Sequence, residues 1–194
     1  MKTWLSGDHH LGHANIIKYC NRPFNNIEEM DDELCSIWNS HVAPEDIVYY
    51  LGDFCLGNSQ LANIYFQRLN GTIFVLGNKW HHDSRWLSGY KVPDVTSYNT
   101  KSGVSVRILL PIEVIDSVGM NADEYAIPAI LCHYAFEIWD RKHYGALHFH
   151  GHSHGELPTM HNRLDVGIDN AFKLTGEYRP LKLDEACEFA AFIL

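Results

Sequence analysis

Apolar and polar positions alternate along this chain with two different periods. In residues 27–42 the apolar side chains fall three or four apart, which predicts an amphipathic helix with Glu28 and Glu29 in its first turn. The same spacing at Leu61, Ile64, Tyr65 and Leu69 predicts a second helix. Short apolar runs between and after these helices predict seven strands: Thr3–Ser6, Ile47–Leu51, Thr72–Leu76, Val104–Leu110, Ala129–Cys132, Ala146–Phe149 and Leu164–Ile168. The early β-α-β-α-β order favours an α/β protein whose first strands pair in parallel, and the strand-rich later part predicts a second, mixed sheet.

Length and composition indicate one ordinary globular domain, residues 1–194. Hydrophobic residues make up 46% of the 194 positions and charged residues 20%. No apolar run is long enough to span a bilayer, and the first residues lack the apolar core of a secretory signal. The five cysteines are scattered and odd in number, which favours buried thiols in a reducing compartment. We therefore expect a cytoplasmic protein with no membrane partner.

The net charge of −9 disfavours broad electrostatic binding to nucleic acid, although bound cations in a cleft would weaken that argument. Thirteen histidines are the more unusual feature, because several cluster with acidic residues just after predicted strands. Ligands of open α/β sheets gather outside the carboxyl ends of the strands, where the loops converge. Five strand ends carry residues that can bind metals: Asp8 and His10, Asp53, Asn78, His133, and His152 with His154.

Each of these motifs is weak evidence when taken alone. An Asp before a His is commonly a capping pair, and Gly52-Asp53 and Gly77-Asn78 are ordinary turn dipeptides. The run from His150 to Gly155 is more specific, because two histidines flank a small residue between glycines.

The motif order D-x-H, GD, GN, an isolated H after a strand, and G-H-x-H resembles the calcineurin-like metallophosphoesterase superfamily. Further stretches resemble its small bacterial and phage branch, namely residues 13–16, 22–24, 131–134, 165–170 and 178–181. The resemblance covers essentially the whole chain. It implies a four-layer αββα sandwich of two mixed β-sheets flanked by helices, in a bacterial cytoplasm or, for a phage-encoded protein, that of its host.

The resemblance also implies two divalent metal ions. Asp8, His10 and His154 would hold the first ion, Asn78, His133 and His152 the second, and Asp53 would bridge them. This mixture of carboxylate, imidazole and amide ligands suits Mn²⁺ first, with Fe, Zn²⁺ or Ni as alternatives, better than Mg²⁺. The lack of thiolate ligands argues against a purely structural zinc site.

Such a pair of ions is typical of phosphoester hydrolysis. Ions roughly 3.5–4 Å apart share a hydroxide that attacks phosphorus in line, and they neutralise the charge that develops. No covalent nucleophile is needed, so we expect Cys55 and Cys132, which lie beside ligands, to be buried apolar filler.

The third motif departs from the family pattern GNHD. The segment from Gly77 to Asp83 places Lys79 where the family has its His. The ammonium group of Lys79 is a poor proton donor near neutral pH unless its pKa is lowered. Lys79 could act on the phosphate electrostatically, or His81 or His82 could serve as the acid. A third alternative is a leaving group that needs little protonation. Family members that lack this His tend to be diesterases or weak monoesterases, so the resemblance favours a phosphodiester or nucleotide-like substrate over a simple monoester.

Two further residues are candidates for contact with substrate. His13 could reach the substrate or a carboxylate behind the ligands, or it could pack. Arg22 could grip phosphate through its planar fork, or it could form an ion pair. His9 should face away from His10. Trp139, His143 and His161 could form a rim near the metals, where a base could stack on the tryptophan, but an aromatic core role is the favoured interpretation of Trp139.

Three functions compete. The first is a dinuclear metal-dependent phosphoesterase (phosphodiesterase or phosphatase) acting on a small phosphoester or nucleotide. The second is a nuclease of the same superfamily, which the acidic charge disfavours. The third is a non-catalytic scaffold that uses the same fold to bind proteins, which the altered third motif favours and the complete ligand set does not.

Overall fold

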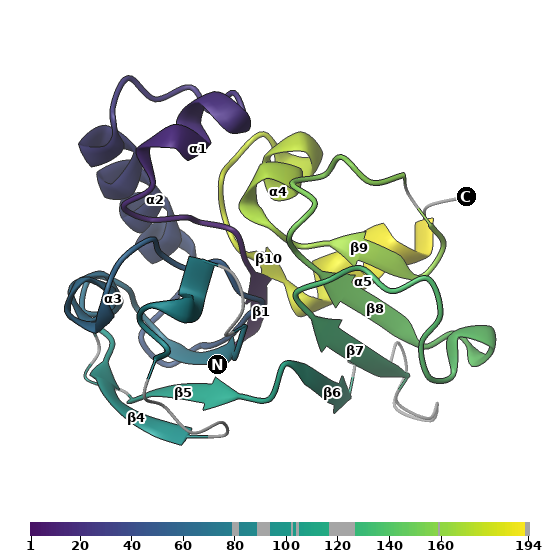
Figure 1. Ribbon diagram of the computed structural model, residues 1–194. Helices are drawn as coiled ribbons and strands as arrows, with labels where there is room; N and C mark the ends of the chain where they lie inside the picture. Colours follow the sequence, from purple (N-terminus) through teal and green to yellow (C-terminus); the bar gives the residue numbers. More distant parts are fainter. Residues whose placement is uncertain are drawn as a thin grey trace.

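The structure is a computed structural model that describes residues 1–78, 82–88, 94–101, 103, 105–116, 127–158 and 160–192. Within these residues the chain forms an α/β sandwich of two mixed β-sheets with helices, as predicted (Figure 1). The six-stranded sheet has the order β10 (Leu181–Lys182), β1 (Thr3–Ser6), β2 (Ile47–Tyr50), β3 (Thr72–Leu76), β5 (Ser105–Leu109), β4 (Asp94–Asn99). The four-stranded sheet has the order β6 (Ile112–Asp116), β7 (Pro128–Cys132), β8 (Leu147–His150), β9 (Arg163–Asp165). The helices are α1 (Ala14–Tyr19), α2 (Ile27–His41), α3 (Ser59–Phe66), α4 (Ile168–Thr175) and α5 (Leu183–Phe192), with short 3-10 helices η1 (His82–Ser84) and η2 (Lys142–Tyr144).

Parallel pairing runs through the centre of both sheets. Strands β1, β2 and β3 pair in parallel, with Trp4 opposite Val48 and Val48 opposite Ile73. Strands β7, β8 and β9 also pair in parallel, and antiparallel neighbours lie at the edges. The carboxyl ends of the parallel strands therefore meet at one end of each sheet, as the strand order predicts.

Side-chain alternation along the first sheet separates two cores. Trp4 and Val48 join α2 residues such as Leu34 in one core, whereas Leu5 belongs to a second core with Phe149 of β8. One face of this sheet is therefore covered by helices and the other by the second sheet. Packing of α2 and α3 is helped by N-caps: Asn26 accepts a hydrogen bond from the Glu29 amide, and Asn58 one from the Leu61 amide.

Helix α5 contacts β1 and β10 of the first sheet and β9 of the second, so it closes the edge between them. The opposite face of the second sheet is covered by the segment before β8. There Trp139 is buried against Ile130 and Ala146, and its indole N–H donates to the Ala146 carbonyl at 2.8 Å. Trp139 is therefore core, as the favoured interpretation predicted, and it does not form a rim near the candidate ligands. His143 and His161 also precede their strands, at the end of the sheet away from the candidate ligands.

One predicted strand is partly wrong. The strand over Leu164–Ile168 ends at Asp165, and Ile168 instead begins α4. Asp165 turns the chain because its carboxylate accepts a hydrogen bond from the Gly167 amide at 2.8 Å. None of the helices in the described part of the chain is both long enough and apolar enough to cross a membrane.

Candidate metal centre

The seven predicted ligands follow the carboxyl ends of β1, β2, β3, β7 and β8, where the two sheets come together. Asp53 lies between two of the histidines, because its Oδ2 is 3.6 Å from His10 Nε2 and 3.5 Å from His133 Nε2. Six of the seven form two groups whose ligand atoms lie within 4.8 Å of one another: Asp8, His10 and His154, and Asp53, His133 and His152. The seventh, Asn78, is buried and lines a small pocket together with His133.

The backbone at these positions is strained. Asp8, His10, Asp53, His152 and His154 all have left-handed backbone, with φ between 49° and 67°. Only Asn21, Arg141 and Asn162 share this conformation among the other described non-glycine residues. Each such residue costs on the order of 1–3 kcal/mol, and such strain concentrates at functional sites.

Buried polar atoms at the centre lack hydrogen bonds. Asp8 Oδ1 and both ring nitrogens of His10 are buried and have no hydrogen-bond partner. Leaving such atoms unpaired costs about 1–3 kcal/mol apiece. A bound cation would satisfy oxygen and imidazole donors placed in this way, so the donor set fits a metal ion.

Two glycines leave room for the carboxylate of Asp8. A Cβ at Gly151 would lie 2.7 Å from Asp8 Oδ2, and a Cβ at Gly167 would overlap the same oxygen. A Cβ at Gly52 would similarly lie 2.8 Å from Nδ1 of His133. These close approaches explain the glycines next to the ligand motifs.

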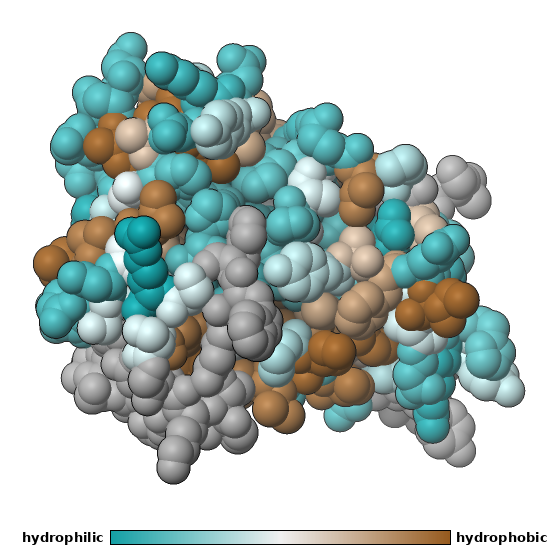
Figure 2. All heavy atoms as spheres, viewed as in Figure 1, coloured by the Kyte–Doolittle hydropathy of each residue, from teal (hydrophilic) through white to brown (hydrophobic). Residues whose placement is uncertain are grey.

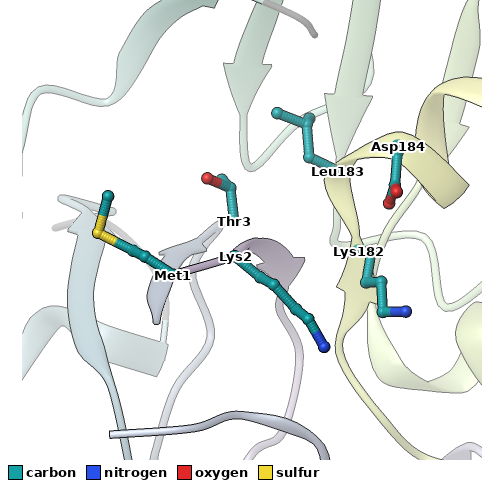
Figure 3. A pocket seen from close by; sticks show the side chains of 6 residues that line it. All are labelled: Met1, Lys2, Thr3, Lys182, Leu183 and Asp184. Atoms are coloured by element: carbon teal, nitrogen blue, oxygen red, sulfur yellow. The ribbon is translucent and has the colours of Figure 1, made fainter. Parts of the chain in front are cut away.

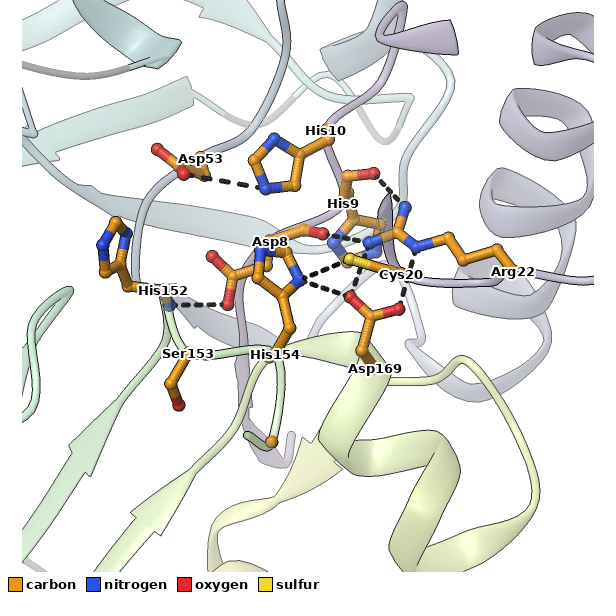
Figure 4. Close-up of polar contacts among 12 residues, drawn as sticks. Asp8, His9, His10, Cys20, Arg22, Asp53, His152, Ser153, His154 and Asp169 are labelled. Atoms are coloured by element: carbon orange, nitrogen blue, oxygen red, sulfur yellow. Dashed lines mark hydrogen bonds and ion pairs between the residues drawn. The ribbon is translucent and has the colours of Figure 1, made fainter. Parts of the chain in front are cut away.

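Neighbouring groups fix the ring orientation of two histidines. Nδ1 of His133 lies 2.8 Å from the Leu51 carbonyl, and Nδ1 of His154 lies 2.6 Å from Asp169 Oδ2 (Figure 4). A proton on Nδ1 in each case leaves Nε2 as the ligand nitrogen, as in many metal sites. Asp169 was not among the predicted site residues, although it lies in the stretch 165–170 that carries part of the family resemblance.

Arg22 holds Asp169 from the other side. Its Nε and Nη2 donate to the two Asp169 oxygens at 2.9 and 2.8 Å, and the remaining N–H groups reach the carbonyls of Asp8 and His9 and the sulfur of Met30. All five N–H donors are therefore occupied by protein groups, and the side chain is buried. The prediction that Arg22 contacts substrate phosphate is wrong, because the fork is saturated by Asp169 and the Asp8–His9 backbone.

Two more carboxylates position the ligand loops. Asp83 is fully buried and accepts hydrogen bonds from the backbone N–H groups of Asp53 and Phe54, at 2.8 and 2.9 Å. Asp165 accepts from the Ser153 hydroxyl and the Gly155 N–H in the loop that carries His152 and His154. Asp83 ends the altered third motif, but only the fold shows that it supports the second one.

The pKa values of three candidate ligands are shifted by burial and by neighbouring charged groups. Burial raises the pKa of Asp8 to about 7. Burial opposes charge on His133, but the Asp53 and Asp8 carboxylates outweigh it and raise its pKa to about 9. The pKa of His154 rises to about 10 for the same reason, because burial is outweighed by Asp169 and Cys20. For these two histidines the nearby carboxylates outweigh burial, so their surroundings favour positive charge, which a bound cation would also supply.

His13 and His82 lie beside His10. The His82 ring centroid is 4.6 Å from that of His10 and 5.0 Å from that of His13, and the three can form a further ligand group. Lys79 and His81 lie outside the described residues. His9 faces away as predicted, with its Nδ1 2.9 Å from the Tyr50 hydroxyl. Cys55 and Cys132 are buried, as expected for apolar filler.

The other end of β1 carries a different kind of pocket. Its volume is about 310 Å³ and its lining side chains include Lys2, Lys182 and Asp184 (Figure 3). It contains neither histidine nor a group of buried unpaired atoms. On the face drawn in Figure 2, hydrophilic residues gather between the region of α1 and that of α4.

The protein is thus an α/β sandwich with a candidate site for two cations. Comparisons with known proteins show which proteins it resembles. No family model matches the chain. It is 50% identical over 80 residues to the uncharacterized protein MJ1445 of Methanocaldococcus jannaschii, a match covering 40% of this chain and 46% of that protein. It is 26% identical over 180 residues to the Gene 66 protein of Mycobacterium phage D29, covering 86% of this chain and 87% of that protein. The Gene 66 protein of Mycobacterium phage L5 is 34% identical over 58 residues, covering 30% of this chain and 28% of that protein.

The chain thus spans less than half of the archaeal relative, and none of these names states an activity. A solved structure, the protein of unknown function AQ665 from Aquifex aeolicus, has the same fold. Its TM-score is 0.62 at 16% identity, over 97% of this chain and 98% of that one.

Proposed function

We propose that this protein is a dinuclear metal-dependent phosphoester hydrolase of the calcineurin-like type. The observation that supports it best is the coincidence of strained backbone at five candidate ligands with buried, unpaired atoms of Asp8 and His10. A protein that needed no cation would gain stability by relaxing either feature.

The proposed first ion is held by Asp8, His10 and His154, and the second by Asn78, His133 and His152, with Asp53 between them. Bound divalent ions, Mn²⁺ foremost, would supply an activated water and neutralise phosphate oxygens. The protein's own part is to orient these ligands through Asp83, Asp165 and Asp169.

His13 and His82 are the groups that we propose protonate the leaving oxygen of the ester. Both are partly exposed next to His10, which makes them the candidates to deliver a proton to an ester oxygen held at the ligands. Burial lowers the pKa of His13 below its usual 6.5, so its protonated form is less available near neutral pH. Lys79 and His81 remain sequence-based candidates for the same task. The proposed substrate is a phosphodiester or nucleotide-like ester, because Lys79 stands where the family has its His.

Two alternatives make different demands. A nuclease needs a basic track for the backbone, and the net charge of −9 disfavours it. A scaffold has no use for strained, unpaired ligand atoms, so the geometry supports catalysis over it.

A cytoplasmic location is part of the proposal. All five cysteines are free thiols, and this suits a reducing compartment.

The test is a screen of the purified protein, reconstituted with Mn²⁺, over monoesters, bis-p-nitrophenyl phosphate, cyclic nucleotides and short oligonucleotides. We expect about two ions per chain and diester hydrolysis that Asp53→Asn lowers by more than about 100-fold with the fold retained. The matched control Asp32→Asn alters an exposed carboxylate paired only with Arg68 and should keep full activity. Fewer than one ion per chain and no hydrolysis would favour the scaffold, whereas cleavage of DNA alone would favour the nuclease.

A further inference from the structure

We propose that the pocket between α1 and α4 binds the base of a nucleotide-like substrate whose phosphate lies at the candidate metal centre. This inference rests on the proposed function and adds to it the recognition of the organic part of the ester. Nucleobase binding by the pocket is nevertheless a property that can be measured without turnover.

The pocket adjoins the candidate centre through a shared residue. Its volume is about 460 Å³, and His154 forms part of its wall together with Cys20 and Asp169. Figure 4 shows the His154 ring between Asp8 on one side and Cys20 with Asp169 on the other. His154 therefore borders both the candidate centre and this pocket, and a ligand with phosphate at the centre would reach the pocket by passing the edge of this ring.

Two aromatic side chains on opposite helices line the pocket. Tyr19, in the last turn of α1, is 74% exposed, and Phe172 of α4 is 39% exposed. The Phe172 ring stacks on Tyr178 with centroids 4.4 Å apart, which holds it in place. Exposed rings on either side of an opening suit a planar aromatic ligand, because bases stack on aromatic side chains.

The charged groups of the pocket are already paired. The Lys173 ammonium donates to the carbonyls of His154 and Gly155 and to Glu156, so its three N–H groups are used. Asp169 is held by Arg22 and His154. The described lining residues thus leave no unpaired cation for a second phosphate, which favours a neutral ring. The exposed Asn21 carboxamide offers both a donor and an acceptor to the edge of a base.

The other pocket beside the ligands is less suited to this task. It adjoins Asn78, His133 and Tyr134 and has a volume of only about 140 Å³. Small-molecule pockets usually have volumes of about 300–1,000 Å³, a range that includes the α1–α4 pocket and excludes this smaller one.

The test is the binding of adenosine, followed by ligand-observed NMR and calorimetry on the full chain, with chelator and with Mn²⁺. We expect adenosine to bind in both conditions and Tyr19→Ala to weaken it about tenfold, the effect of losing a stacked base. The matched control is Tyr144→Ala, which removes a tyrosine that is 77% exposed on η2 and should leave adenosine binding unchanged. The milder variant Phe172→Leu should weaken adenosine binding in the same direction.

Inorganic phosphate and ribose separate the parts of the ligand. Phosphate affinity with Mn²⁺ should be equal in the wild type and Tyr19→Ala, and ribose should not compete with adenosine. Absence of adenosine binding, or equal loss in Tyr19→Ala and Tyr144→Ala, would overturn the pocket assignment. Failure of the proposed function has a different signature, namely no Mn²⁺-dependent diester hydrolysis while Tyr19-dependent adenosine binding persists.

Discussion

The Nδ1 atom of His154 lies 2.6 Å from Oδ2 of Asp169, and this contact determines which ring nitrogen of the imidazole can bind a cation. A proton shared between these atoms leaves the Nε2 lone pair free. Asp169 is itself held by two hydrogen bonds from Arg22, so the orientation of His154 depends on a chain of three side chains. Carboxylate partners of this kind commonly tune metal ligands.

Asp169→Asn should weaken metal binding by about 10–100-fold, because the amide is a poorer acceptor and its NH₂ group competes for the same position. The measurement is a competition titration with a chromophoric chelator, with circular dichroism to check the fold. Asp32→Asn, on the exposed surface, is the control and should bind metal normally. Unchanged affinity in Asp169→Asn would show that the carboxylate does not act through His154.

Gly167→Ala should lower metal content and destabilise the protein by about 1–3 kcal/mol. The backbone at Gly167 has φ −62°, which alanine adopts easily, so the cost arises from the overlap between the new Cβ and Asp8 Oδ2. Gly7→Ala is a close control, since a Cβ there meets only ordinary contacts of 3.6 Å or more. Urea unfolding and metal analysis of both variants test the idea, and equal behaviour of the two would contradict it.

Arg22→Lys should lower the free energy of unfolding by about 3–5 kcal/mol, because a lysine cannot replace the paired contacts to buried Asp169. The control is Arg68→Lys, whose exposed pair with Asp32 should contribute no more than about 1 kcal/mol. Denaturant unfolding gives both values. A stable Arg22→Lys protein with a raised KM would instead restore the phosphate-binding role that its buried contacts argue against.

Local patterns in the sequence predict much of this fold. The spacing in residues 27–42 predicts α2, and β2 and β3 lie within a residue of their predicted bounds, because their apolar runs are short and clearly bounded. Strands β4, β6 and β10 were not predicted. The parallel pairing of β1, β2 and β3 follows from the alternation of strands with helices. The convergence of the candidate ligands follows in turn, since parallel strands end at the same edge.

What the sequence does not predict depends on contacts between distant residues. Arg22 is an ordinary surface candidate until Asp169, 147 positions away, is placed against its fork. The run after Leu164 has the apolar character of a strand, but the Asp165 carboxylate turns the chain before Ile168. Trp139 could be a rim or a core residue, and only its hydrogen bond to the Ala146 carbonyl decides the matter.

Asp46 provides a test of pH dependence away from the candidate centre. This buried carboxylate accepts hydrogen bonds from the Lys2 N–H at 2.6 Å, the Trp4 indole at 2.9 Å and the Ala43 N–H at 3.1 Å. Burial opposes its ionisation, but these donors outweigh burial and hold the pKa of Asp46 below its usual 3.8. A lowered folded-state pKa means that the carboxylate stabilises the fold fully above about pH 4 and loses that contribution as the pH falls through the folded-state pKa.

Asp46→Asn should therefore lower the free energy of unfolding by about 1–3 kcal/mol near neutral pH, because the amide NH₂ would face N–H groups that donate hydrogen bonds to the carboxylate. The difference from the wild type should stay constant down to about pH 5 and shrink below about pH 4, where the wild-type carboxylate becomes protonated. Urea unfolding of both proteins across this range measures it, with the exposed Asp140→Asn as control. A difference that grew on acidification would mean that the folded state raises the pKa of Asp46, and this result would contradict the prediction.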